Sequence, residues 1–392
     1  MLRWGFRLIV VLFLVVGGLA AFAYFKPVEV SRLVWPHIED YMLQDPFVGV
    51  TTDGTPQNGL FDIRETGVDT SGIVEAANGF IDSLSAEQQS RLLFPVDDTE
   101  WRRWANIHLS TRQGVGFLEM TDAQATAALN LLAESLSPQG FDNAISIMSL
   151  EGHLADLMNH APGYGEKRYW MTIMGTPSTD APWGWQIDGH HLVINFFVLG
   201  DQVVMTPTFM GSEPPVAGPG PFEGIEVLQT EQNAGLAFVN TLTDAQRAVA
   251  ILSDEKGTNN NYSELFSDNA VVPYEGIRLA DLTDDQQKQA RQLIRLYIGN
   301  MNAGHAAVKM VEVLRHWDET YFAWIGKTDD DAVFYYRFQS PVVMIEFDHQ
   351  GPIALSGPNR PSRDHVHTVV RTPNGNDYGK DLLRQHLQQH TH

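Results

Sequence analysis

Two stretches, IMGTPSTDAPWGWQIDGHHLVINF (173–196) and WIGKTDDDAVFYYRFQSPVVMIEF (324–347), decide the fold, because they align with each other without a gap. Both alternate in polarity and are rich in aromatic and β-branched residues, which is the pattern of antiparallel hairpins. Identical or aromatic residues coincide at several positions: Gly175 with Gly326, Trp185 with Tyr336, Ile194 with Ile345, and Phe196 with Phe347. We therefore expect two related halves, each containing a sheet.

Helices are predicted ahead of the strands in each half. Four segments, LSAEQQ, MTDAQ, LTDAQ and LTDDQQ, place Ser or Thr three residues before Gln, the spacing of a capping box at a helix N-terminus. Apolar residues then recur at helical spacing. Since helices and strands come in blocks, the expected class is α+β with two pseudo-symmetric repeats, not an α/β parallel sheet. The capping pairs are Ser85 and Gln88, Thr121 and Gln124, Thr243 and Gln246, and Thr283 and Gln286.

The first 25 residues form a separate segment. Two arginines precede an uncharged apolar run, LIVVLFLVVGGLAAFAYF, which suits either a signal peptide or an uncleaved N-terminal membrane anchor, a single hydrophobic helix. The positive flank places the rest of the protein outside the cytoplasm in both cases. We expect a periplasmic or otherwise extracytoplasmic protein, secreted or anchored in the membrane.

The remaining chain divides at its turn-rich stretches. Residues 26–70 are predicted to be an irregular lead-in, residues 71–211 the first half, and residues 222–392 the second half. The Pro- and Gly-rich stretch GSEPPVAGPGPFEG (211–224) connects the halves, which we expect to form one globular unit.

Composition excludes several classes of function. The formal charge is −22, from 48 acidic and 26 basic residues. An acidic surface repels phosphate backbones, so nucleic acid is not an expected partner. There is no cysteine, which excludes disulfides, thiolate nucleophiles and cysteine-based zinc sites. Any metal must be held by histidine, carboxylate or other oxygen ligands.

A candidate site is centred on DHVHTVVR (364–371). In a strand, side chains two apart leave the same face, so His365 and His367 are predicted to point at one spot. The first hairpin adds His190, His191 and Asn195, where the second half has other residues. By alternation His191 shares a strand face with Asn195, and only one of the two adjacent histidines can face a shared site.

These residues suggest a metal centre. His191, His365, His367 and Glu346 form a coordination set for a divalent transition metal, with zinc favoured and iron, copper or manganese possible. A bound water of lowered pKa would serve as the nucleophile, with Glu346 as last ligand or general base. The predicted catalytic set comprises Glu346, Asn195 and Arg371, the last binding an anionic substrate group. Asp364 is predicted to orient a histidine.

Simpler interpretations stand beside each of these predictions. Glu346 in the apolar strand MIEF needs a buried partner, and Arg337 would serve as well as a metal. The helix SLEGHLADLMNH (149–160) is ordinary, although Glu151 could face the site. Trp183 and Trp185 could bind substrate together with His190, but tryptophans at alternate strand positions are also typical of a core.

Several motifs together resemble the bacterial family known as domain of unknown function 3500. They are PWGWQIDGHHLVINF, IEFD, DHVHTVVRTPNGNDYGKDLL and the repeated LTDAQ helices, and they span about residues 75–390. The resemblance implies that GHHL (189–192), Glu346 and the His-x-His pair followed by Arg371 are retained features. One departure is a Gly- and Pro-containing loop before that pair, where an Asn-rich stretch is more usual. The resemblance implies no activity.

The sequence thus favours an exported or membrane-anchored metal-dependent hydrolase with a His/Glu site between its halves, acting on an unidentified small-molecule or polymeric substrate. The alternative is a non-catalytic periplasmic module that binds a ligand in a polar and aromatic cleft. A third hypothesis is an iron- or copper-dependent oxidoreductase that uses the same residues.

Overall fold

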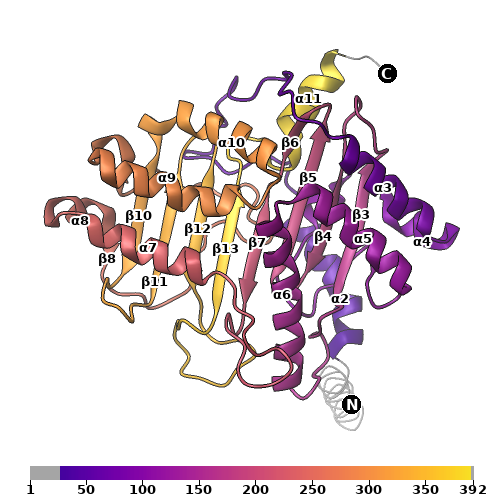
Figure 1. The fold of residues 1–392 in the computed structure, drawn as a ribbon, viewed down its shortest axis with the longest axis horizontal. Coiled ribbons are helices and arrows are strands. Elements are labelled where there is room, and N and C mark those ends of the chain that lie inside the picture. The colour runs from indigo at the N-terminus through magenta and orange to yellow at the C-terminus, as the bar shows by residue number, and fades with distance from the viewer. Residues whose placement is uncertain (1–26, 390–392) are drawn as a thin grey trace, which may run out of the picture.

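A computed structural model describes residues 27–389 of the chain (Figure 1). The predicted signal peptide or anchor, residues 1–25, lies outside the described residues. Across 27–389, no helix combines the length and the apolar character needed to cross a bilayer.

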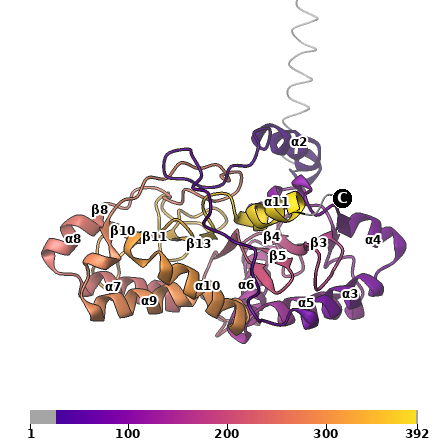
Figure 2. The same ribbon diagram turned by 90° about the horizontal axis from the view of Figure 1, so that it is seen from above.

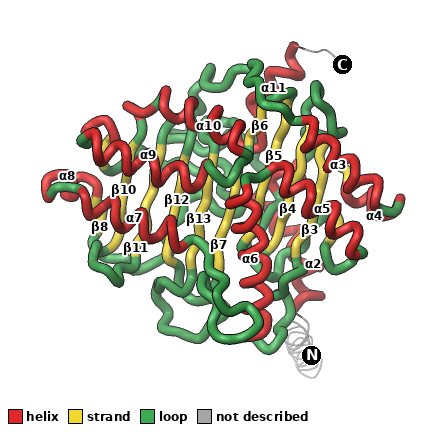
Figure 3. The backbone as a smooth tube through the Cα atoms, in the orientation of Figure 1, coloured by secondary structure: helices red, strands yellow, loops and turns green. Residues whose placement is uncertain are grey.

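A single 13-stranded sheet runs through the middle of the molecule (Figures 1 and 3). Its order is β1-β3-β4-β5-β7-β13-β12-β11-β10-β8, with β2, β6 and β9 pairing with β3, β5 and β10. The pairs from β3 to β10 are antiparallel, and β1 and β8 add parallel edges. The strands are β1 (Leu93–Phe94), β2 (Val115–Gly116), β3 (Tyr169–Gly175), β4 (Trp183–Gly189), β5 (Leu192–Leu199), β6 (Gln202–Val204), β7 (Thr208–Ser212), β8 (Ile251–Ser253), β9 (Ile277–Arg278), β10 (Tyr321–Gly326), β11 (Phe334–Gln339), β12 (Met344–His349) and β13 (Val366–Arg371).

The two hairpins recognised in the sequence have the same strand register. Trp185 pairs with Phe196 across β4 and β5, and the aligned Tyr336 pairs with Phe347 across β11 and β12. The predicted antiparallel strands and the mixed α+β class are confirmed. The two hairpins join one continuous sheet, because β7 pairs with β13 in its centre.

Most of the helices cover one face of this sheet (Figure 2). All four predicted capping boxes are present, at the N-termini of α4, α5, α8 and α9. The glutamines of each successive pair also bond to each other, Gln124 to Gln88 and Gln286 to Gln246, both at 2.9 Å. The helices on this side are α3 (Ser71–Ser83), α4 (Ala86–Leu92), α5 (Asp122–Ser135), α6 (Pro138–Leu157), α7 (Gln229–Thr241), α8 (Asp244–Ala250), α9 (Asp284–Ile298) and α10 (Ala303–Arg315).

The opposite face is covered by α2 (Pro27–Met42), α11 (Lys380–Gln389) and long loops (Figure 2). A large apolar core lies under the helices, and a second cluster, which includes Trp101, Trp104 and Tyr378, lies under the loops. Short 3-10 helices are η1 (Thr99–Arg102), η2 (Leu279–Asp281), η3 (Trp317–Glu319) and η4 (Asp377–Gly379). Both faces are therefore buried, which explains why side chains on β4, β5 and β12 are buried at every position.

The lead-in differs from its prediction. A helix, α2, occupies residues 27–42, where an irregular segment was expected, and it continues through Pro36. Residues 43–70 are irregular as predicted, with an isolated bridge from Thr51 to Val271. They also pack on the sheet, since Arg64 donates its backbone N–H to Gln202 on β6 at 2.7 Å.

Candidate metal centre

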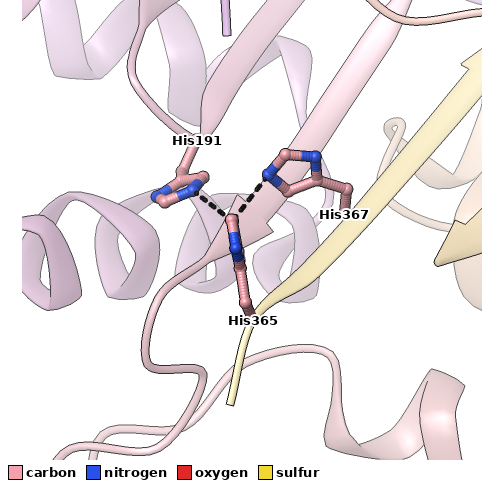
Figure 4. A group of neighbouring side chains, drawn as sticks. All are labelled: His191, His365 and His367. Atoms are coloured by element: carbon pink, nitrogen blue, oxygen red, sulfur yellow. Dashed lines mark hydrogen bonds between the residues drawn. The ribbon is translucent and has the colours of Figure 1, made fainter. Parts of the chain in front are cut away.

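Three histidine side chains meet where β13 begins (Figure 4). His365 directly precedes β13, His367 is its second residue, and His191 lies between β4 and β5. The Nε2 atom of His365 lies 2.9 Å from that of His367 and 3.3 Å from that of His191. All three side chains are buried. The prediction that His365 and His367 point at one spot is confirmed, and His191 reaches this spot from the first half.

The Nδ1 atom of each ring faces an oxygen that can accept its proton. The pairs are His365 and the Gly351 carbonyl at 2.7 Å, His367 and Glu264 at 2.7 Å, and His191 and Glu151 at 3.3 Å. A carbonyl can only accept, so the proton of His365 must lie on Nδ1, and carboxylate partners favour the same tautomer in the other two rings. Outer hydrogen bonds of this kind are typical of metal-binding histidines.

In neutral rings with protonated Nδ1, each Nε2 presents a lone pair. The close Nε2 contacts are then no hydrogen bonds, because both atoms are acceptors, and a cation between them would relieve the repulsion. Metal–nitrogen bonds of about 2.0–2.1 Å place two ligand atoms about 2.9 Å apart at a right angle and about 3.4 Å apart at the tetrahedral angle. The observed distances of 2.9 and 3.3 Å fit this range. His191, His365 and His367 therefore suit a transition-metal ion.

The backbone of His191 explains how the first half reaches this centre. His191 lies in the tight turn between β4 and β5 and has φ 64°, a left-handed conformation that is uncommon outside glycine. Its carbonyl accepts a bond from the Gly211 N–H at 2.8 Å, which fixes the turn to β7. Strand alternation, on which the sequence prediction for His191 relied, does not apply in such a turn.

Both adjacent histidines bind one carboxylate. Glu151 on α6 contacts His190 Nδ1 at 2.8 Å through Oε1 and His191 Nδ1 at 3.3 Å through Oε2. The turn sets the two rings 3.7 Å apart, but only His191 belongs to the three-histidine group. The suggestion that Glu151 faces the site is confirmed. Glu151, His190 and His191 form a second group of potential ligand atoms that shares His191 with the first.

Three carboxylates contact the histidines of the centre. Glu151, Glu213 and Glu264 have ion-pair contacts with histidines, the Glu213 carboxylate lying 3.7 Å from His365 Nδ1. Other buried acids nearby pair with full cations: Asp188 with Arg112, Asp348 with Lys256, and Asp268 and Asp377 with Arg371. A dication at the three Nε2 atoms would add positive charge beside these three carboxylates.

Burial and neighbouring charges shift the pKa values of the residues in this centre. Burial, reinforced by the charge of His190, lowers the pKa of His191 to about 3. Burial and the neighbouring His367 hold the pKa of His365 well below its ordinary value. Burial alone would raise the pKa of Glu151, but the charge and hydrogen bonds of His190 and His191 outweigh it and lower this pKa to about 2. His191 and His365 are therefore neutral at physiological pH, which is the form that binds metals.

Glu346 belongs to neither group of ligand atoms. On β12 it pairs with Val369, whereas Asp348 is the residue opposite His367. Its carboxylate accepts bonds from Ser263, from the Tyr262 N–H at 2.9 Å and from the Tyr335 hydroxyl at 2.8 Å. Burial raises the pKa of this carboxyl group. Glu346 lies two residues, about 7 Å, along β12 from the residue opposite His367, and its carboxylate binds core groups instead.

The other two residues of the predicted catalytic set also bind within the core. Asn195 accepts a bond from Gln186 at 2.6 Å and donates to the Pro207 carbonyl at 2.8 Å. The fully buried guanidinium of Arg371 donates to Asp268, Asp377 and the Ser263 carbonyl. The side-chain amide of Asn195 and the guanidinium of Arg371 therefore already bind core groups, not a substrate.

The tryptophans and Asp364 lie away from the converging atoms. Trp183 and Trp185 are fully buried in the core under the helices, and the Trp185 indole donates to Ser135 at 3.2 Å. Their burial matches the core alternative, with no ring exposed for stacking on a substrate. Asp364 is exposed, and the carboxylates that contact the histidines are Glu151, Glu213 and Glu264 instead.

A cleft of about 1,030 Å³ borders the centre. Its walls are the loops 254–257, 327–333 and 352–364, and both Glu213 and His365 line it. Glu213 fastens the 352–364 loop by accepting backbone N–H bonds from Ile353, Ala354 and Leu355, at 2.9 to 3.2 Å. This loop, which lines the cleft, is therefore attached beside His365, a candidate ligand.

The chain belongs to the family described as Protein of unknown function (DUF3500), whose family model matches residues 66–380. The resemblance noted in the sequence is confirmed. No curated protein and no solved structure shows significant similarity to the chain. The three histidines and all their carboxylate partners lie within the matched residues.

Proposed function

We propose that this protein is an exported or membrane-anchored metal-dependent hydrolase, whose metal, zinc by preference, is bound by His191, His365 and His367. The convergence of three Nε2 lone pairs carries this proposal. Three histidines are a donor set of catalytic zinc sites, in which a fourth position holds water. Iron, copper and manganese also bind imidazole, so metal identity is part of the test.

In this proposal, the side chains of the protein position the three metal-binding imidazoles and keep bulk water away from them. A bound zinc ion would supply hydroxide near pH 7 by lowering the pKa of its water. Glu151, Glu264 and the Gly351 carbonyl hold the three imidazoles in the metal-binding tautomer. The cleft beside His365 is the proposed substrate entrance, and its volume suits a small organic molecule or the end of a polymer.

We also infer that the two halves are repeats that share this one centre. The equal hairpin registers and the matched glutamine pairs support this inference. The cross-strand pair Gln186 and Asn195 occupies the position of Arg337 and Glu346 in the other hairpin. A neutral pair in one half thus replaces charged residues in the other, while the metal ligands come from both.

The test is turnover by the metal-loaded full-length chain on chromogenic carboxylic esters, phosphate esters and peptide anilides. We expect hydrolysis of one class, its loss with a chelator, and its recovery with zinc. His367→Ala should be inactive, whereas His37→Ala, at an exposed site on α2, should match the wild type. Turnover that survives in His367→Ala would contradict the proposal.

One specific observation favours a second candidate, a non-catalytic binding module. The three carboxylates near the histidines are all engaged in hydrogen bonds, so none is free to act as a general base. A chain that binds one metal ion but hydrolyses none of the three substrate classes would support metal-assisted ligand binding instead.

A further inference from the structure

A second cavity, of about 260 Å³, lies near the opposite end of β13 from the histidine centre. It is enclosed by the lead-in residues 59–66, by β6, by the end of α9 and by α10, with Val370 and Thr372 at its base. His365 and Thr372 are separated by seven residues, so about 20 Å divides this cavity from the metal centre. None of its lining residues belongs to that centre.

The walls of this cavity are fixed by hydrogen bonds of their own. The lead-in is tied to the β5–β6 turn, because Asp201 accepts from the N–H groups of Thr66 and Gly67 at 2.7 and 2.6 Å. Gln202 donates to the Asp62 carbonyl at 3.0 Å. Lys309 donates to the Val342 carbonyl at 2.8 Å, which attaches α10 to the connection between β11 and β12. The cavity is therefore preformed, as small-molecule sites usually are.

One buried polar atom in the wall has no partner. His305 is 4% exposed, lines the cavity, and its Nε2 atom makes no hydrogen bond to the described residues. An unpaired buried polar atom is destabilising, so it suggests a binding role. Burial lowers the pKa of His305 to about 4, so the ring is neutral and can donate one N–H.

The charged groups of the cavity favour an anion. His305 and Lys309 are four residues apart on α10 and therefore share one face of the helix. Arg64 and Arg315 also line the cavity, against the acids Asp62 and Glu312, so cations are in excess. Lys309 pairs with Glu312 and lies 6.0 Å over the Phe61 ring. The rest of the lining is largely apolar, including Met205, Met301 and Val370.

We propose that this cavity binds a small organic carboxylate with a compact apolar body. The carboxylate group accepts a hydrogen bond from the His305 N–H beside the Lys309 ammonium, and the apolar body packs against Phe61 and Met301. The volume is below the roughly 300–1,000 Å³ of sites for drug-sized ligands, which limits the ligand to a small aromatic or short aliphatic acid. This site is independent of the proposed metal centre.

Ligand-observed NMR and calorimetry on the full-length chain test the proposal, with benzoate and hexanoate as probes. Benzyl alcohol and hexylamine are the matched controls, because they keep the apolar body and change the polar group. We expect saturable carboxylate binding that is roughly tenfold or more tighter than that of either control, given the strength of hydrogen bonds to a charged group.

Two variants locate the binding, and a third is the control. Val308→Trp places a large ring in the cavity from a half-buried position on α10 and should abolish carboxylate binding without unfolding the chain. His305→Phe, which removes the unpaired nitrogen at similar size, should weaken it. His365→Ala/His367→Ala should bind the acids as the wild type does. Equal binding of acids and amines, no saturable binding, or undiminished binding in a folded Val308→Trp variant would overturn the proposal.

Discussion

Replacing Glu264 by Gln tests whether the outer carboxylates support a metal ion. Glu264 accepts the Nδ1 proton of His367 at 2.7 Å, and glutamine keeps the shape and an acceptor oxygen while it removes the charge. Across the imidazole ring, the carboxylate would lie about 7 Å from a metal bound at Nε2. The variant therefore isolates the electrostatic contribution to binding.

The magnitude follows from that separation. A dication and a carboxylate 7 Å apart attract by about 5 kcal/mol at an effective dielectric constant near 20. Solvent and protein relaxation reduce this value, and loss of an outer partner typically weakens metal affinity by about 10–100-fold, or about 1.4–2.7 kcal/mol. We therefore expect the zinc Kd of Glu264→Gln to rise by about 10–100-fold.

The assay is zinc competition against a chromophoric chelator at fixed pH and ionic strength, with circular dichroism to confirm folding. Glu223→Gln is the matched control, because Glu223 is exposed and the substitution removes the same charge from the chain. The reasoning fails if folded Glu264→Gln binds zinc within twofold of the Glu223→Gln control.

Four further predictions concern stability. Arg371→Met should lower the free energy of unfolding by about 3–5 kcal/mol in urea titrations, because it leaves Asp268 and Asp377 buried without their cation; a loss below 1 kcal/mol would contradict this. Metal removal by a chelator should lower the Tm of the wild type but leave that of a His365→Ala/His367→Ala variant unchanged, since only metal bound to the folded state stabilises it. The metal-free protein should become less stable as pH falls from about 6.5 towards 3, because His191 has a folded pKa near 3 and the unfolded chain binds its proton first; a stability that is constant between pH 7 and 5 would exclude this neutral state. Limited proteolysis should cut the 352–364 loop faster in Glu213→Gln than in the wild type, because the loop N–H bonds lose their charged acceptor.

Features that depend on neighbouring residues were predicted well from the sequence. The capping boxes at Ser85, Thr121, Thr243 and Thr283 need only residues three apart. The hairpins depend on alternation, and the approach of His365 and His367 follows from strand geometry alone. The central β7–β13 pairing was not predicted, because it joins segments with no local signal for each other.

The sequence predicted the three histidines of the site but not two of the carboxylates that contact them. Glu264 and Glu213 lie in irregular segments, and nothing in their local sequence indicates that they will contact histidines. His191 reaches the centre through a left-handed turn, so a strand-based argument selected the right residue for an incomplete reason. Glu346 was expected at the site because it aligns with Asn195 of the first hairpin, whereas in the structure its carboxylate accepts hydrogen bonds from Ser263 and Tyr335.

The central claim is that three Nε2 atoms bind one transition-metal ion. Elemental analysis combined with X-ray absorption spectroscopy on the untagged full-length chain, beside the His365→Ala/His367→Ala variant, tests it most directly. The account predicts about one equivalent of metal with three imidazole nitrogens at about 2.0–2.1 Å, absent from the variant. Metal content that is negligible in the wild type, or equal in both proteins, would contradict it.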